Sequence, residues 1–295
     1  MALHHKIAAA VLRKIPSSRA LGLGRYWRAM ERLRSADTAF ISFPKSGRTF
    51  VRVMLARLYQ QQFGIDERAL LKYSTLVRSP PEVPRLLFTH AGDAMHRPDQ
   101  ITIDREAFGA CKVILLARHP GDIAVSRYFH CKHRTTDRAR QRLARQPLEQ
   151  FIWTEQGGIP SIVEFLNQWA DFSTHKRDMM IIRYEDILRE PASSLAELAG
   201  FIGLHGDRDQ IAEAVEFARF DRLKETERLG YFRSNRMGAG RDGGANSYKV
   251  RAGGSGGFHA LLGEEAQRAV RSYVESHLDP LFGYEQRGLS AVGSA

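Results

Sequence analysis

Cysteine is scarce in this sequence, and long hydrophobic runs are absent from it. Its 295 residues include only Cys111 and Cys131, too few for a disulfide framework, so we expect a reducing compartment and a cytoplasmic protein. No apolar run approaches the roughly 20 residues of a membrane-spanning helix. Internal repeats are also missing. The composition is that of an ordinary globular chain, with room for one large domain or two small ones.

Acidic residues are missing from the first thirty positions, which contain six Lys or Arg. We expect residues 1–34 to form a basic helical segment, followed by one domain at 35–290 and a flexible tail at 291–295. A solvated helix, a membrane-surface helix and a targeting segment all fit the basic segment. The net charge of +11 points to anionic partners: nucleic acid, a membrane surface or anionic small molecules.

Three apolar strands alternate with helical patterns. The runs at 37–43, 111–117 and 178–184 are continuous apolar segments, and Pro120 and Asp122 mark a helix start after the second. This rhythm predicts an α/β fold, a three-layer sandwich with a central parallel sheet covered on both sides. Ligands bind such sheets beyond the carboxyl ends of the strands, so we expect the functional loops there.

The first strand leads into the nonapeptide SFPKSGRTF, which is similar to the P-loop pattern G-x-x-x-x-G-K-[ST]. Ser42 stands at the first glycine of that pattern and Arg48 at its lysine, while Lys45 comes early. A strand that delivers such a turn to a helix start creates an anion site, because the first N–H groups of the helix have no partner. An altered nucleoside-triphosphate loop and a simple tight turn are the alternatives.

Two further stretches interrupt the strand–helix rhythm. Residues 127–145 are densely basic, with Asp137 as their one acid, and residues 238–257 are glycine-rich and predicted to be a mobile loop. The basic stretch fits a solvated charged helix or the rim of a site for an anionic glycan or lipid.

Four motifs in order, PKSGRTF, ARHPGDIAVSRYF, RYED and RAGGSGGF, resemble those of the sulfotransferases that use 3′-phosphoadenosine 5′-phosphosulfate. The resemblance runs from about residue 37 to 286 and includes the closing LDPLFGYE. It implies a P-loop-like phosphosulfate-binding loop and this nucleotide as co-substrate, with no metal required. A phosphosulfate carries less charge at its reacting end than a triphosphate, so cationic side chains and backbone N–H groups can hold it.

The resemblance also implies the residues that bind the nucleotide, in three groups. The 5′-phosphosulfate would be held by Lys45, Ser46, Gly47, Arg48 and Thr49. The adenine would lie against Phe50, Tyr184 and Phe220. The 3′-phosphate would be held by Arg118, Ser126, Arg251, Ala252 and Gly253.

Four positions depart from the family pattern. Phe50 stands where the family usually has a tryptophan, and Ala252 replaces a lysine, which removes one cationic contact with the 3′-phosphate. Gly257 replaces an aspartate, and Phe88 replaces a lysine next to the acceptor side. That last change weakens any role for a second cation there.

For the chemistry, the resemblance implies His90 as the base that takes the acceptor proton, Lys45 on the leaving oxygen, and Ser126 as a third catalytic residue. Histidine suits the role because its pKa lies near neutral. Asp93, in the same THAGD segment, is the rival base.

We expect the acceptor to be a small-molecule, glycan or lipid hydroxyl, with an amine as a further candidate, and the sequence does not identify it. A P-loop kinase or NTPase is the alternative function, although no strand-ending Asp for Mg²⁺ is evident. A nucleic-acid-binding module is disfavoured, because the basic residues lack interleaved aromatics or a reader motif. Peripheral membrane contact through the basic N-terminus and the oligomeric state are left open.

Overall fold

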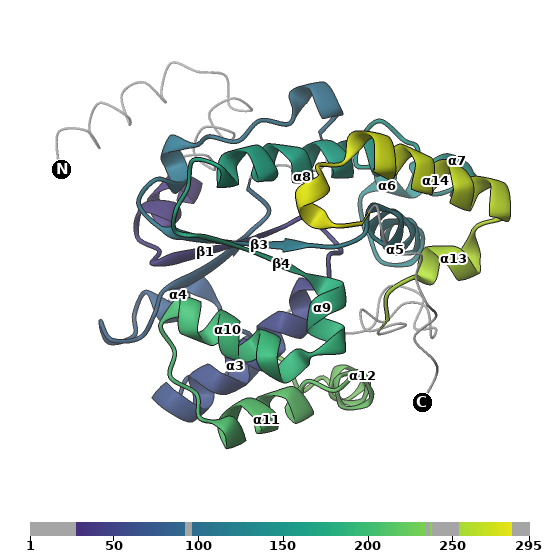
Figure 1. Ribbon diagram of the computed structural model, residues 1–295. Helices are drawn as coiled ribbons and strands as arrows, with labels where there is room; N and C mark the ends of the chain where they lie inside the picture. Colours follow the sequence, from purple (N-terminus) through teal and green to yellow (C-terminus); the bar gives the residue numbers. More distant parts are fainter. Residues whose placement is uncertain (1–27, 92–95, 234–236, 238–253, 285–295) are drawn as a thin grey trace, which may run out of the picture.

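The computed structural model describes residues 28–91, 96–233, 237 and 254–284 (Figure 1). Its centre is a four-stranded parallel sheet in the order β2-β1-β3-β4. The strands are β1 (Thr38–Ser42), β2 (Leu86–Thr89), β3 (Lys112–Ala117) and β4 (Met179–Arg183). The three predicted strands are confirmed as β1, β3 and β4. The apolar segment before His90 forms the additional strand β2.

Helices cover both faces of the sheet, as Figure 1 shows. One face packs against α5 (Pro120–His133), α8 (Ile159–Ser173) and α14 (Glu264–His277), and the other against α3 (Arg48–Phe63), α10 (Pro191–Ile202) and α11 (Arg208–Phe217). The shorter helices are α4 (Tyr73–Leu76), α6 (Arg138–Leu143), α7 (Leu148–Phe151), α9 (Tyr184–Arg189), α12 (Phe220–Arg228) and α13 (Gly257–Leu261). Single 3₁₀ turns lie at Glu67–Ala69, Pro98–Gln100, Glu106–Phe108 and Pro280–Phe282. The predicted three-layer α/β sandwich is confirmed.

The central strands β1 and β3 are mainly apolar because both of their faces are buried. Along β1, Phe40 enters the core shared with α3 and α10, whereas Ala39 and Ile41 enter the core shared with α5 and α8. All five residues of β1 are buried, and its three central residues are apolar, because a polar side chain at those positions would lose its contact with water. This burial fixes the position of the loop that follows Ser42.

The basic stretch 127–145 is not a single solvated helix. It forms the end of α5 and all of α6, and Arg127 is only 2% exposed. The Arg127 guanidinium lies against Gly157 and over the Phe151 ring, and burial lowers its pKa to about 10. The exposed cations of this stretch are Lys132, Arg138, Arg142 and Arg145.

Parts of the predicted domain plan lie outside the described residues. This applies to residues 1–27, to most of the glycine-rich loop and to residues 285–295. The predicted boundaries of the basic segment (1–34), the domain (35–290) and the tail (291–295) therefore stay predictions. Among the described helices, none is long and apolar enough to cross a membrane.

Candidate functional site

The loop between β1 and α3 presents an uncapped helix start. Gly47 is the N-cap of α3 with φ +89°, no side chain caps this terminus, and its first turn contains no acidic residue. Lys45 also has a positive φ of +83°, a conformation that L-residues rarely adopt. The Ser46 side chain is fully buried, and its Oγ has no hydrogen-bond partner in the described part of the chain. Thr49 is half-buried in the first turn of α3. A positive helix end beside a buried, unsatisfied hydroxyl fits an anionic group.

Tyr184, at the end of β4, closes this loop from the other side. A Cβ at Gly47 would lie 2.3 Å from the Tyr184 ring, so the backbone can approach the ring only at a glycine. The Arg118 guanidinium lies 4.6 Å from the centre of the same ring, and Phe50 meets it edge-on at 6.5 Å. Three strand ends therefore meet around one aromatic side chain. The predicted Phe50, Arg118 and Tyr184 are brought together.

Arg118, which follows β3, ties two loops to one another. It donates to the Lys45 carbonyl oxygen at 3.2 Å and to the Gly254 carbonyl oxygen at 3.0 Å. Its buried Nε has no hydrogen-bond partner within the described residues. The chain segment after the glycine-rich loop therefore lies beside the phosphate loop. Arg251, Ala252 and Gly253, which come directly before Gly254, lie outside the described residues.

The remaining predicted nucleotide contacts are only partly placed. Ser126 lies within α5, eight residues after Arg118, and is half-buried. Phe220 is the first residue of α12 and is half-buried. Within the described chain no ring contact joins Phe220 to Tyr184 or Phe50, so its place near the adenine stays a prediction.

His90 is held at the end of β2 by two bonds through its ring nitrogens. Nδ1 lies 2.6 Å from the Ser42 carbonyl oxygen, and Nε2 lies 2.7 Å from Nη2 of Arg48. Because a guanidinium can only donate, Nε2 is the acceptor, and the proton of the neutral ring is on Nδ1. Nη1 of Arg48 also donates to the Thr89 carbonyl oxygen at 2.8 Å. Two predicted site residues 42 positions apart are thus in direct contact, while Asp93 lies outside the described residues.

The charge of Lys45 acts on a residue of α5. Burial raises the pKa of the Cys131 thiol, and Lys45 is among the cations that partly offset this rise. The ammonium group therefore lies within electrostatic reach of the α5 face that carries Cys131.

The prediction from sequence missed the role of Asp122. Its carboxylate is 3% exposed and accepts hydrogen bonds from the backbone N–H of Gly256 at 2.7 Å and of Phe258 at 3.1 Å. A helix-start aspartate usually caps its own helix; this one instead fixes the segment 254–258 against α5. In the sequence, the only signal for this role was the acidic residue itself, Asp122, between HPG and IAVS.

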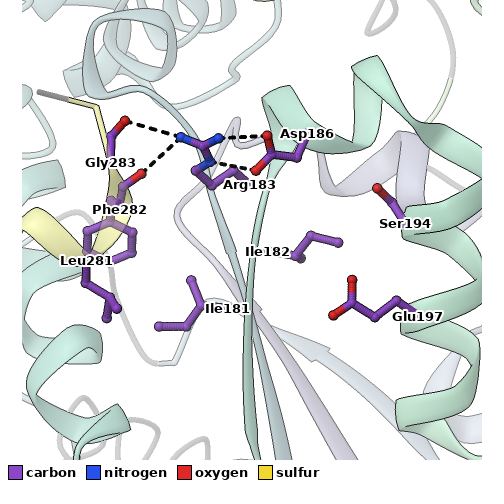
Figure 2. Close-up of a pocket in the computed structure, with 9 residues that line it drawn as sticks. All are labelled: Ile181, Ile182, Arg183, Asp186, Ser194, Glu197, Leu281, Phe282 and Gly283. Atoms are coloured by element: carbon purple, nitrogen blue, oxygen red, sulfur yellow. Dashed lines mark hydrogen bonds and ion pairs between the residues drawn. The ribbon is translucent and has the colours of Figure 1, made fainter. Parts of the chain in front are cut away.

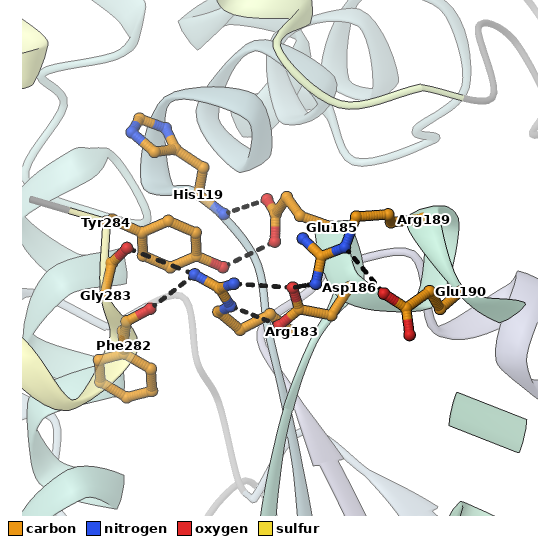
Figure 3. A network of polar contacts seen from close by, with 9 residues as sticks. All are labelled: His119, Arg183, Glu185, Asp186, Arg189, Glu190, Phe282, Gly283 and Tyr284. Atoms are coloured by element: carbon orange, nitrogen blue, oxygen red, sulfur yellow. Dashed lines mark hydrogen bonds and ion pairs between the residues drawn. The ribbon is translucent and has the colours of Figure 1, made fainter. Parts of the chain in front are cut away.

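Glu185 of the RYED motif was also missed as a structural link. It accepts from the His119 N–H at 2.9 Å and from the Tyr284 hydroxyl at 2.8 Å, and burial raises its pKa (Figure 3). Beside it, Arg183 donates to both oxygens of Asp186 and to the carbonyls of Phe282 and Gly283. The closing LDPLFGYE segment is therefore bonded to the strand ends that carry Arg118 and Tyr184.

His119 supplies a pH-dependent part of the stability. It is the N-cap of α5, where its Nδ1 accepts from the Gly121 N–H and its ring stacks on Phe258, and burial lowers its pKa to about 4. The unfolded chain binds a proton near pH 6.5 and the folded chain does not. Stability is therefore lost as the pH falls from about 6.5 toward 4, by roughly 3 kcal/mol.

We expect His119→Asn to remove most of this pH dependence, because asparagine can cap the helix without titrating. The measurement is the free energy of unfolding in urea at pH 7, 5.5 and 4.5 for both proteins. The wild type should lose more stability than the variant over this range. Parallel curves would show that His119 is not the responsible group.

Figure 2 shows a cavity elsewhere, of about 370 Å³, at the outer edge of β4. Its walls come from β4, α9, α10 and the turn before Gly283. None of the predicted site residues lines it, so we do not take it as the active site. Within the described residues, no group of three His, Cys, Asp or Glu could hold a metal ion.

Comparisons with known proteins agree on one family. A family model described as a sulfotransferase domain matches residues 35–282. An amine sulfotransferase of Oryctolagus cuniculus is 23% identical over 84% of this chain and 82% of its own length. Sulfotransferase 2A1 of Homo sapiens is 23% identical over 68% of this chain and 70% of its own.

Solved structures show the same fold. Mouse sulfotransferase SULT7A1 complexed with PAP, the nucleotide product 3′-phosphoadenosine 5′-phosphate, aligns with a TM-score of 0.58 at 17% identity, covering 84% of this chain and 88% of that one. Retinol dehydratase in complex with androsterone and PAP aligns with a TM-score of 0.57 at 18% identity, covering 82% of this chain and 80% of that one.

Proposed function

Since this chain belongs to the sulfotransferase domain family and is a transferase, we propose that it moves a sulfuryl group from 3′-phosphoadenosine 5′-phosphosulfate to a hydroxyl or amine of a small molecule. The observation that carries the proposal is the family match over 35–282. Within that span, the loops after β1, β3 and β4 meet at an uncapped helix start. The kinase or NTPase alternative is not favoured by the comparisons.

The described residues fit the proposed donor. The unsatisfied Ser46 hydroxyl, the bare backbone at Gly47 and the Lys45 and Arg48 cations would receive the 5′-phosphosulfate. Arg118 and Ser126 would receive the 3′-phosphate, and Phe50 and Tyr184 the adenine. Metal independence stays a prediction, as do a cytoplasmic location and peripheral membrane contact.

In the proposed reaction, His90 removes the acceptor proton through Nε2 as the acceptor oxygen or nitrogen bonds to sulfur. The bond from sulfur to the bridging oxygen breaks in line, and its electron pair stays on the 5′-phosphate. Lys45 stabilises the charge that develops on that oxygen. The small molecules in complexes of two structural neighbours, androsterone and retinol, support a small-molecule acceptor.

The product PAP should raise the melting temperature far more than AMP does at equal concentration. The two nucleotides differ in the 3′-phosphate, and losing two charge-assisted contacts of about 1.5–3 kcal/mol each lowers affinity by roughly 10²–10⁴-fold. A ligand at 1,000 times its Kd adds about 4 kcal/mol to the free energy of unfolding, a shift easily measured by differential scanning fluorimetry. Equal stabilisation by PAP and AMP, or a preference for ATP with Mg²⁺, would contradict the proposal.

The acceptor is identified by a separate screen. Transfer of labelled sulfate from the donor would be followed with phenols, steroids, amines, sugars and lipids. We expect transfer to a phenol, steroid or amine, and the label should remain on the donor when the acceptor is left out.

A further inference from the structure

The contact between Arg48 and His90 has a chemical consequence for the proposed base. The Nε2 lone pair is the one that would receive the acceptor proton, because Nδ1–H is bonded to the Ser42 carbonyl oxygen. That lone pair already accepts from Arg48 at 2.7 Å. In this arrangement His90 is neutral and correctly oriented, but its basic nitrogen is occupied. The proton transfer requires Arg48 to leave.

The position of Arg48 shows what could draw it away. It is the first residue of α3, directly after Gly47, at the helix start where the backbone is shaped for an anion. A guanidinium forms stronger, often bidentate bonds with a phosphate or sulfate than with a neutral imidazole. A phosphosulfate at this helix start would therefore compete with His90 for the same side chain.

Phe88, two residues before His90, contributes no cation beside the His90 ring. Phe88 stands where the family pattern has a lysine, and it is only 8% exposed. The Arg52 guanidinium stacks 3.9 Å from the centre of its ring. The β2 strand thus contributes an aromatic packing surface there, and the cation beside His90 is supplied by α3.

We propose that Arg48 is a positioning residue that alternates between His90 and the phosphosulfate of the donor. Without donor it occupies Nε2 and holds the ring in the Nδ1–H tautomer. With donor it turns to the anion and uncovers Nε2 for the acceptor. The inference rests on the proposed function. It adds that the donor acts before the acceptor proton is removed, because His90 can serve as a base only after the donor has bound.

The first test measures how available Nε2 is in the protein without nucleotide. Diethyl pyrocarbonate reacts with an imidazole nitrogen that has a free lone pair, and peptide mass spectrometry follows the product at His90. A charge-assisted hydrogen bond of ordinary strength lowers the free fraction of its acceptor about tenfold or more, so Arg48→Met should speed modification of His90 by a similar factor. Arg142→Gln, an exposed arginine on α6, is the matched control and should leave the rate unchanged. Equal rates in the wild type and Arg48→Met would overturn the contact.

The second test follows the Nε2 nitrogen of His90 in the wild type and uses two variants as references. In protein labelled with ¹⁵N-histidine, the Nε2 resonance of His90 is assigned by its loss in His90→Gln. On saturation with PAP it should move toward the position of an unbonded nitrogen, and in Arg48→Met it should already be there and stay. An unmoved resonance with bound PAP would overturn the exchange. Failure of PAP to bind the wild type in calorimetry would instead contradict the proposed function, and the exchange with it.

Discussion

Replacing His90 with alanine should lower turnover by about 10²–10⁴-fold, the usual contribution of a positioned base. The Ser42 carbonyl oxygen lies 2.6 Å from Nδ1 and fixes the ring, so Nε2 is the nitrogen that would take the acceptor proton once Arg48 has left it. The affinity for PAP should be preserved or rise, because His90 is not a proposed phosphate contact and its removal ends its competition with the phosphate for Arg48. Turnover at saturating donor and PAP affinity by calorimetry are the two measurements.

Two comparisons make this result specific. His205→Ala removes an exposed histidine beside Gln62, at the opposite end of α3 from the loop after β1, and should leave both quantities unchanged. Asp93→Asn tests the rival base in the same segment. A nearly normal His90→Ala beside an inactive but folded Asp93→Asn would move the assignment to the carboxylate.

The fold could be predicted because its central strands are buried on both faces. Continuous apolar runs of five or six residues, each followed by a helix-start signal, identify parallel strands without further information. The β2 strand was less evident, since in the described residues only two 3₁₀ turns, Pro98–Gln100 and Glu106–Phe108, and no α-helix lie between it and β3. The strand order could not be predicted at all, because it depends on which crossovers pack against which face.

The location of the site could be predicted from the sequence, but most of the contacts between its residues could not. The carboxyl ends of parallel strands meet at one edge, so loops after β1, β3 and β4 had to be neighbours. The pairing of Arg48 with His90 could not be predicted, because it joins a helix start to an edge strand 42 residues later. The same holds for Asp122, whose partners Gly256 and Phe258 lie more than 130 residues away.

Burial of charge was the least predictable feature. Arg127 belongs to a stretch with many cations, and nothing in the local sequence distinguishes it from its exposed neighbours. Its position on the inner face of α5 against Phe151 and Gly157 is set by the packing of the loop before α8. A formal charge count therefore overstates the cationic surface of this segment.

Lys45→Gly should lower turnover while leaving the fold as stable as the wild type or slightly more stable. The substitution removes the amine that would stabilise the leaving oxygen. Removal of one preorganised donor of this kind lowers turnover by about 10²–10³-fold. PAP affinity should also fall, by roughly tenfold or more, because the same amine would bind the 5′-phosphate in the ground state. The backbone at Lys45 has φ +83°, which glycine adopts without strain.

Lys45→Ala separates the two effects of that substitution. Alanine removes the amine but keeps the unfavourable φ, which costs on the order of 1 kcal/mol relative to glycine, partly offset by the greater freedom of glycine in the unfolded chain. Both variants should therefore lose turnover equally, and Lys45→Gly should unfold at the higher urea concentration. Nearly normal turnover in both would exclude Lys45 from the chemistry. Equal stability with unequal turnover would mean that the shape of the loop, and not the amine, is what the reaction requires at this position.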